Sequence, residues 1–482
     1  MSTLAGRVAT SVRWSMLDQV VQQVVRFGLT LLLTRLTSPE AYGLIGIAFV
    51  FTGIASFVGD LGMGAAVVQR KDLTPRHVDT AAITAFGLGV VLAALVVVTA
   101  PWSARAFDEP DLALVLAVVA LNFPVKAVGG VLRDVLRRDL EFGGITVANV
   151  VGVLVSGAAA AVVAVSGGGV WALVVYSVGE ACVVTAAMLV ACLRAGVHVP
   201  RPRFSRTAFR DLFSFGLSVT GFKLLYYLQI NLDNLLVGKF LGATALGFYG
   251  LAYRLMLYPI QRVGDVIANV ALPAFSVVQD SAERLTGAYR RGTVAISLVV
   301  FPLSVGTVVA APVLVPLAVG EQWTPAVLPL QVLALNGPRL AVNRLGSAVF
   351  QATGRPHWDV WLAGGGLVVY VGAFAVGLQH GVVGMAWAYT AAGFALLVPN
   401  QVLITRTPLL HPTRVLWSLW PVVLGCVALV LAALGARELV PGHGFLAAVT
   451  VVLAGGAAYA AVVWLTGRGL VLQTVRDLRS RG

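Results

Sequence analysis

Long apolar stretches recur along the whole chain, each bounded by charged residues or by clusters of Gly and Pro. A helix needs about 20 apolar residues to cross the hydrocarbon core of a bilayer. By this criterion the sequence predicts about fourteen transmembrane helices, and the fold class we expect is an all-α polytopic membrane protein. The predicted spans are 14–36, 42–66, 80–101, 111–132, 143–166, 169–193, 213–238, 242–270, 292–315, 325–350, 358–378, 382–405, 414–435 and 444–466.

The composition supports this interpretation. Of the 482 residues, 58% are hydrophobic and 11% are charged, whereas a soluble globular domain has about 25% charged residues. So few charges would not cover the surface of a water-soluble fold of this length. The first apolar stretch is too long for a signal peptide, so we expect it to stay in the mature protein.

The distribution of basic residues predicts the orientation in the membrane. Lys and Arg concentrate in every second connection, for example at Arg70, Lys71 and Arg76, and again in the C-terminal tail. The intervening connections are short and neutral or acidic. Because cytoplasmic loops retain Lys and Arg, we expect an even number of spans in the bacterial cytoplasmic (inner) membrane, with both termini in the cytoplasm.

The remaining composition argues against an enzyme or a nucleic-acid-binding protein. The net charge of +13 is spread in short basic runs rather than gathered on one surface. The cysteines Cys182, Cys192 and Cys426 have neither disulfide nor metal-site spacing. The phosphate-loop, dinucleotide, metalloprotease and nucleophile-elbow motifs do not occur. We therefore expect no catalytic residue, no metal and no bound cofactor.

An internal repeat is suggested by two similar passages, 38–48 and 242–252, which lie on either side of the longest connection. A chance match among small residues is the alternative interpretation. A real repeat would place a cavity between two six-helix lobes. The matched pairs are Gly43 with Gly247, Gly46 with Gly250 and Ala48 with Ala252. The expected parts are an N-terminal lobe at 1–196, a basic cytoplasmic linker at 197–212, a C-terminal lobe at 213–408, and two extra helices with a basic tail at 409–482.

Polar side chains recur at spacings of three and four in several spans, so they share one helical face. Charges inside a membrane are costly, and they commonly mark a substrate path. A basic lining with tyrosines suits an anionic headgroup that carries sugars. The headgroup contacts that we predict are Arg26, Lys223, Arg254 and Arg262. The predicted cavity lining is Gln22, Gln23, Tyr227, Asn231, Asp233 and Tyr258. The weaker candidates for ion coupling are Asp60, Glu180 and Asp265.

Other interpretations of these residues stay open at this point. In one alternative, the charged pairs only hold the bundle together; these pairs are Asp18–Arg26, Lys223–Asp233 and Arg262–Asp265. Asp60 and Asp265 are also typical of charges at the cytoplasmic rim. Prolines within four spans are expected to break or kink helices, either beside a cavity or as plain irregularity of packing. These prolines are Pro124, Pro259, Pro302 and Pro338.

The middle of the chain resembles the Wzx-type polysaccharide flippases, closest to the colanic-acid-exporter type. The resemblance lies in NLDNLLVGKFLG at 231–242, LAYRLM at 251–256 and LPAFS at 272–276. It implies the fold of the multidrug/oligosaccharidyl-lipid/polysaccharide exporter superfamily, with two six-helix lobes around a central cavity. It also implies flipping of undecaprenyl-diphosphate-linked oligosaccharides by alternating access, driven by an H⁺ or Na⁺ gradient. The resemblance places basic residues of the first and eighth helices in the cavity, which fits Arg26 and Arg254.

The function that we expect is therefore export of lipid-linked oligosaccharide repeat units for surface polysaccharide biosynthesis. The expected partners are the lipid-linked oligosaccharide, membrane lipids, a polysaccharide polymerase and glycosyltransferases, with no nucleic acid. Alternatives from the same superfamily are a peptidoglycan-precursor flippase and a cation-coupled multidrug antiporter. A membrane glycan polymerase or ligase is a further alternative, but the predicted outer loops are too short for the catalytic domain of such an enzyme.

Overall fold

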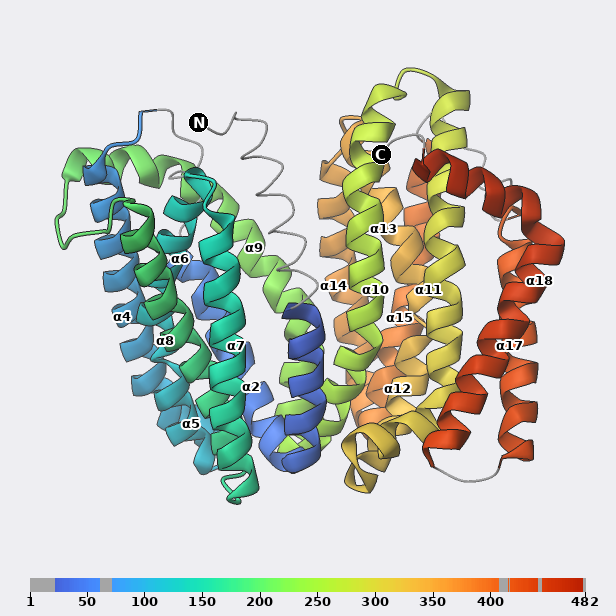
Figure 1. Cartoon of the computed structure of the whole chain (residues 1–482), viewed down its shortest axis with the longest axis horizontal. Coiled ribbons are helices and arrows are strands. Elements are labelled where there is room, and N and C mark those ends of the chain that lie inside the picture. The colour runs from blue at the N-terminus through green and yellow to red at the C-terminus, as the bar shows by residue number, and fades with distance from the viewer. Residues whose placement is uncertain (1–21, 61–71, 407–414, 416, 441–443, 480–482) are drawn as a thin grey trace. The chain divides into compact units, whose positions relative to one another are not determined.

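The computed structural model describes residues 22–60, 72–406, 415, 417–440 and 444–479. The chain divides into two compact units, Met1–Gly247 and Phe248–Gly482, here called the first and second unit. In the first unit a helix at 22–36 is followed by α2 (Pro39–Asp60), α4 (Pro75–Phe107), α5 (Asp111–Val119), α6 (Asn122–Arg138), α7 (Phe142–Val165), α8 (Val170–Ala195) and α9 (Arg206–Leu241). Figure 1 shows these helices. The next helix, α10 (Ala243–Val277), has its first five residues in the first unit.

The second unit contains the greater part of α10 and is also helical in its described residues (Figure 1). Its further helices are α11 (Ala282–Val319), η1 (Glu321–Ala326), α12 (Val327–Ala334), α13 (Gly337–Ala352), α14 (His357–Gly377), η2 (Leu378–His380), α15 (Gly381–Arg406), α17 (Trp420–Leu439) and α18 (Phe445–Arg479). The units divide at Gly247, after α9, because α9 packs against α2 and α4. The predicted lobes divide before α9, and that division stays a prediction.

The predicted all-α membrane fold is confirmed. Each predicted span is overlapped by at least one helix. Within the described residues, eight helical stretches are long and apolar enough to cross a membrane, one of which contains both α14 and α15. The number of fourteen crossings stays a prediction.

Two of the four prolines coincide with interrupted spans. The predicted span 111–132 is divided into α5 and α6, and the predicted span 325–350 is divided before α13. Pro124 and Pro338 each lie in the first turn of the helix that follows the break, where the missing N–H of proline leaves no helical hydrogen bond unmade. By contrast, α10 and α11 continue through Pro259 and Pro302.

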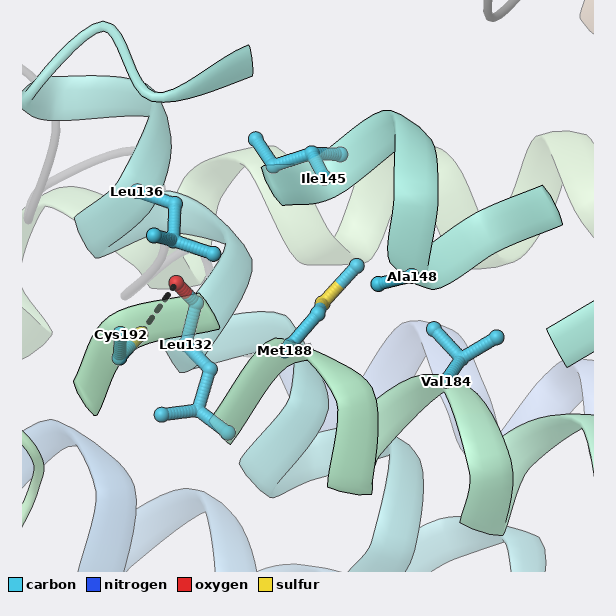
Figure 2. Close-up of a cluster of buried hydrophobic side chains, with 7 residues drawn as sticks. All are labelled: Leu132, Leu136, Ile145, Ala148, Val184, Met188 and Cys192. Atoms are coloured by element: carbon cyan, nitrogen blue, oxygen red, sulfur yellow. Dashed lines mark hydrogen bonds between the residues drawn. The ribbon is translucent and has the colours of Figure 1, made fainter. Parts of the chain in front are cut away.

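A cluster of buried side chains joins α6, α7 and α8 (Figure 2). Lipid tails are as apolar as these side chains, so close packing rather than water exclusion holds such helices together. The thiol Sγ of Cys192 lies 3.9 Å from the carbonyl oxygen of Leu132, which links α8 to α6. The cluster consists of Leu132, Leu136, Ile145, Ala148, Val184, Met188 and Cys192. This three-helix core fixes the positions of the polar side chains on α6 and α8.

Candidate functional site

The first unit contains an ion pair between two of the predicted site residues. The guanidinium of Arg26, in the helix at 22–36, pairs with the carboxylate of Glu180 in α8. The side chain of Arg26 is 37% exposed and that of Glu180 is 19% exposed. Gln22 lies one turn before Arg26, and its Oε1 accepts hydrogen bonds from Nε and Nη2 of Arg26 at 3.2 and 3.1 Å. The arginine is therefore held by two helices and stays partly accessible.

Two further polar side chains complete this site. Tyr176 lies one turn before Glu180 on the same face of α8, and its hydroxyl group is within hydrogen-bonding reach of Arg26. Lys126 of α6 is close enough to Glu180 and Arg26 for their charges to act on it. Lys126 is exposed. We call Arg26, Lys126, Tyr176 and Glu180 the Arg26 cluster.

The charges of the Arg26 cluster do not cancel. Arg26 and Lys126 contribute two positive charges, and Glu180 contributes one negative charge. A second anion can therefore be held by the same cations, and charge-assisted hydrogen bonds from Arg and Lys to phosphate are short and strong. An anionic ligand would also compete with Glu180 for Arg26.

The structure brings together Arg26 and Glu180, which the sequence placed in different roles. Sequence reasoning treated Glu180 as a lone carboxylate, because its partner lies on a helix far away in the sequence. It missed Lys126 and Tyr176 altogether. Lys126 is one of only four lysines and falls inside the predicted span 111–132, so its position within an apolar stretch was the available signal.

Three predicted lining residues of α9 have neighbours within the first unit. The hydroxyl group of Tyr227 donates to the carbonyl oxygen of Phe49 in α2 at 3.0 Å. The amide of Asn231 donates to the carbonyl oxygen of Tyr227 at 3.0 Å. Asp233 is buried, and its Oδ1 accepts from the backbone N–H of Asn234 at 2.8 Å. Tyr227 thus ties α9 to α2, and a role for these residues along a sugar path stays a prediction.

The other predicted site residues are less fully described. Gln23 is half-buried in the helix at 22–36. Arg254 is exposed and Tyr258 is half-buried, and both lie in α10 of the second unit. Four predicted residues fall outside the side chains that the structure describes; they are Lys223, Arg262, Asp60 and Asp265. Among the side chains that are described, no group of three or more His, Cys, Asp or Glu residues is placed to hold a metal ion.

Comparison with known sequences shows which family this chain matches. A family of sequences described as polysaccharide biosynthesis proteins matches residues 32–328. The teichuronic acid biosynthesis protein TuaB of Bacillus subtilis is 27% identical over 396 residues, covering 81% of this chain and 80% of that protein. The lipopolysaccharide biosynthesis protein WzxC of Escherichia coli is 27% identical over 350 residues, covering 72% of this chain and 70% of that protein. The succinoglycan biosynthesis transport protein ExoT of Rhizobium meliloti is 24% identical, covering 82% and 80%.

Solved structures show the same fold at low sequence identity. The lipid II flippase MurJ, in an inward closed conformation, superposes with a TM-score of 0.76 at 12% identity, covering 95% of this chain and all of that chain. An inward-facing multidrug resistance transporter of the MATE family, within the MOP superfamily, superposes with a TM-score of 0.58 at 16% identity, covering 80% and 95%. The predicted superfamily fold is therefore confirmed.

Proposed function

Because this chain belongs to the family of polysaccharide biosynthesis proteins, we propose that it flips polyprenyl-diphosphate-linked oligosaccharides across the bacterial cytoplasmic membrane. The family match over residues 32–328 is the observation that carries this proposal. The proposed orientation has both termini in the cytoplasm. Glycosyltransferases supply the lipid-linked repeat unit on the cytoplasmic side, and a polymerase uses it on the outer side.

A flippase must move a charged, hydrated headgroup past lipid while the polyprenyl tail stays in the bilayer. Alternation between inward-facing and outward-facing states gives the headgroup access to each side in turn. A cationic group in the protein replaces part of the water that the diphosphate loses. In the first unit, the Arg26 cluster supplies this group, with Arg26 and Lys126 as its two cations.

The Arg26 cluster also offers a route for ion coupling. Glu180 neutralises Arg26 in the ion pair, with Lys126 and Tyr176 beside it. A proton on Glu180 abolishes the negative charge and frees Arg26 for the diphosphate. We take H⁺ as the coupling ion for this reason. Lys223, Arg254 and Arg262 remain proposed headgroup contacts, and Asp60 and Asp265 remain proposed secondary sites of coupling.

A complementation experiment tests the proposed function. Deletion of the gene should make lipid-linked repeat units accumulate on the cytoplasmic side and should abolish export of the glycan. Wild type should restore export, whereas Arg26→Ala should lower it by about tenfold or more, because a charge-assisted hydrogen bond contributes about 1.5–3 kcal/mol. The matched control is Arg105→Ala, an exposed arginine at the end of α4, which should export normally at equal expression.

The phenotype of the deletion strain also distinguishes the proposed function from the alternative functions. Accumulation of peptidoglycan precursors would replace the proposed substrate with a cell-wall precursor. Increased drug sensitivity with normal glycan export would indicate a multidrug antiporter. Lipid-linked repeat units that reach the outer side but stay unpolymerised would indicate a polymerase. Each of these results contradicts the proposed function.

A further inference from the structure

The second unit holds a buried arginine to which the described residues offer no counter-ion. Arg339 lies in α13 and is 5% exposed. Its Nε donates to Oδ1 of Asn336 at 3.0 Å, while its Nη2 is buried without any hydrogen-bond partner. None of the ion pairs found among the described residues includes Arg339. Because a guanidinium keeps its charge in proteins, the free energy of burying this charge is unfavourable unless an anion joins it.

The guanidinium lies against α15 and next to a group of tyrosines. Its Cζ is 5.8 Å from the centre of the Tyr389 ring, and a Cβ on Gly393, one turn later, would approach Cζ to 2.6 Å. The Tyr389 ring makes an edge contact with Tyr253 of α10 and stacks on Tyr370 of α14, both at 5.6 Å between ring centres. All three tyrosines are half-buried, so the ring of Tyr389 lies next to the cation and the rings of Tyr253 and Tyr370 adjoin Tyr389.

The position of Arg339 is fixed by hydrogen bonds that do not involve a carboxylate. Nδ2 of Asn336 donates to Oγ1 of Thr390 at 2.7 Å, and Thr390 donates in turn to the carbonyl oxygens of Ala386 and Val332. Oδ1 of Asn336 is thereby directed to Arg339. The arginine is held in place before any ligand arrives, and such preorganisation favours binding.

The two units differ in how they balance the charge of an arginine within the helices. Arg26 in the first unit has Glu180 as its counter-ion, whereas the described surroundings of Arg339 are neutral. We propose that Arg339, with Tyr253, Tyr370 and Tyr389, binds a carboxylate-bearing sugar of the transported glycan. This inference rests on the proposed function and deepens it, because it assigns an acidic repeat unit as the substrate class.

The chemistry of the site favours an acidic sugar over a phosphate. The planar guanidinium matches the two oxygens of a carboxylate, and aromatic faces pack against the apolar C–H face of a sugar ring. A phosphate group has no such face, and the Arg26 cluster already provides cations for the diphosphate. Since Arg339 is buried, the sugar binds when neighbouring side chains move and expose Nη2.

Binding to the purified protein tests this site directly. The full chain in lipid nanodiscs is titrated calorimetrically with trigalacturonate, with neutral maltotriose and with inorganic pyrophosphate. Trigalacturonate should bind wild type, and Arg339→Gln should weaken it by about tenfold or more, while Arg339→Lys should retain part of the affinity. The matched control Arg284→Gln removes an exposed charge at the start of α11 and should leave binding unchanged.

Several outcomes would overturn the assignment. These are absence of trigalacturonate binding to wild type, equal binding of maltotriose, and unchanged binding to Arg339→Gln. Loss of pyrophosphate binding in Arg339→Gln would identify a phosphate site instead. Failure of the proposed function shows separately, as absence of accumulated lipid-linked repeat units in the deletion strain.

Thermal unfolding separates a ligand site from a purely structural role. Without ligand, Arg339→Gln should melt at or above the temperature of wild type, because it removes an uncompensated buried charge. Trigalacturonate should raise the melting temperature of wild type and not that of Arg339→Gln. A clear drop in the melting temperature of ligand-free Arg339→Gln would show that Arg339 stabilises the fold, and it would contradict the proposed site.

Discussion

Glu109, in the short connection between α4 and α5, shows how one side chain joins two helices outside the membrane spans. Its Oε1 accepts a hydrogen bond from the backbone N–H of Ala243, the first residue of α10, at 3.4 Å. Burial raises the pKa of the Glu109 carboxyl above its ordinary 4.5, and the hydrogen bond from Ala243 opposes that shift. Neighbouring carboxylates, including Glu40 and Asp111, act in the same direction as burial.

This shift predicts a dependence of stability on pH. The folded state holds the Glu109 proton more tightly than the unfolded state, so this group lowers the free energy of unfolding as pH rises from about 4.5 through the folded-state pKa. Glu109→Gln keeps an acceptor for Ala243 and removes the titration. The melting temperature of Glu109→Gln should therefore fall less than that of wild type across this window.

Thermal unfolding of the detergent-solubilised protein at a series of pH values measures the difference. The control is Asp280→Asn, which changes an exposed carboxylate that is not among the groups acting on Glu109 and should leave the slope of wild type unaltered. Parallel profiles for wild type and Glu109→Gln would contradict the assignment.

Single residues also show which features of the site could not be predicted from the sequence. Arg26 was predicted from the polar face of its helix, because helical spacing is local information. The partner Glu180 and the neighbour Lys126 come from helices that only the folded chain brings near. Arg339 resembles any other arginine in the sequence, since its burial and its lack of a counter-ion are properties of the packing. Sequence therefore predicted candidate charges but not their pairing.

At the scale of elements, one connection is fixed by hydrogen bonds to the start of α4. Asp79 is 2% exposed, and its Oδ1 lies 2.7 Å from Nε2 of His198 and accepts from the backbone N–H of Arg201 at 2.8 Å. Oγ1 of Thr80 accepts from the backbone N–H of Ser205 at 3.0 Å. The sequence predicted a basic linker at 197–212, but α9 begins at Arg206, and the non-helical part is bound to α4.

Asp79→Ala should release this connection. The substitution removes the hydrogen bond from the N–H of Arg201, and such a bond contributes about 0.5–1.5 kcal/mol. We expect faster trypsin cleavage after Arg203 in Asp79→Ala than in wild type, under conditions where both are folded. Asp72→Ala is the matched control, because Asp72 is exposed. Equal cleavage rates for wild type and Asp79→Ala would show that Asp79 does not hold the linker.

Element positions were largely predictable because hydropathy is a strong signal over twenty residues. Element boundaries were less predictable. The helices α4, α9 and α11 extend well beyond the apolar stretches that predicted them, since helical hydrogen bonding continues through polar residues outside the lipid. The break between α5 and α6 falls inside one apolar run and follows from Pro124 rather than from hydropathy.

At the scale of the whole molecule, the repeated passages turn out to contact each other. A Cβ on Gly43 of α2 would overlap the carbonyl oxygen of Ala243, and a Cβ on Gly247 of α10 would overlap the carbonyl oxygen of Pro39. In the alignment of the passages, Pro39 corresponds to Ala243 and Gly43 corresponds to Gly247. The two contacts are therefore equivalent under exchange of the halves. A repeat predicts such reciprocity, whereas chance similarity among small residues does not require it.

This reciprocal crossing predicts matched effects of substitution at its two glycines. Gly43→Ala and Gly247→Ala should each lower the melting temperature by a similar amount, because an added methyl group in a tight contact costs about 1–3 kcal/mol. The double variant should lose less than the sum of the two, since either methyl group alone already separates α2 from α10. Gly28→Ala is the control, because no atom lies within 4 Å of a Cβ at that position.

Thermal unfolding in nanodiscs, read as a double-mutant cycle, decides whether the crossing is one structural unit. Strict additivity would show that Gly43 and Gly247 serve separate contacts, and a large effect at one glycine alone would break the equivalence of the halves. Single substitutions of similar effect, together with a non-zero coupling energy between them, would instead mean that the repeat preserves a single close approach of two helices. That contact constrains both passages at once, which explains why the same small residues occur in each of them.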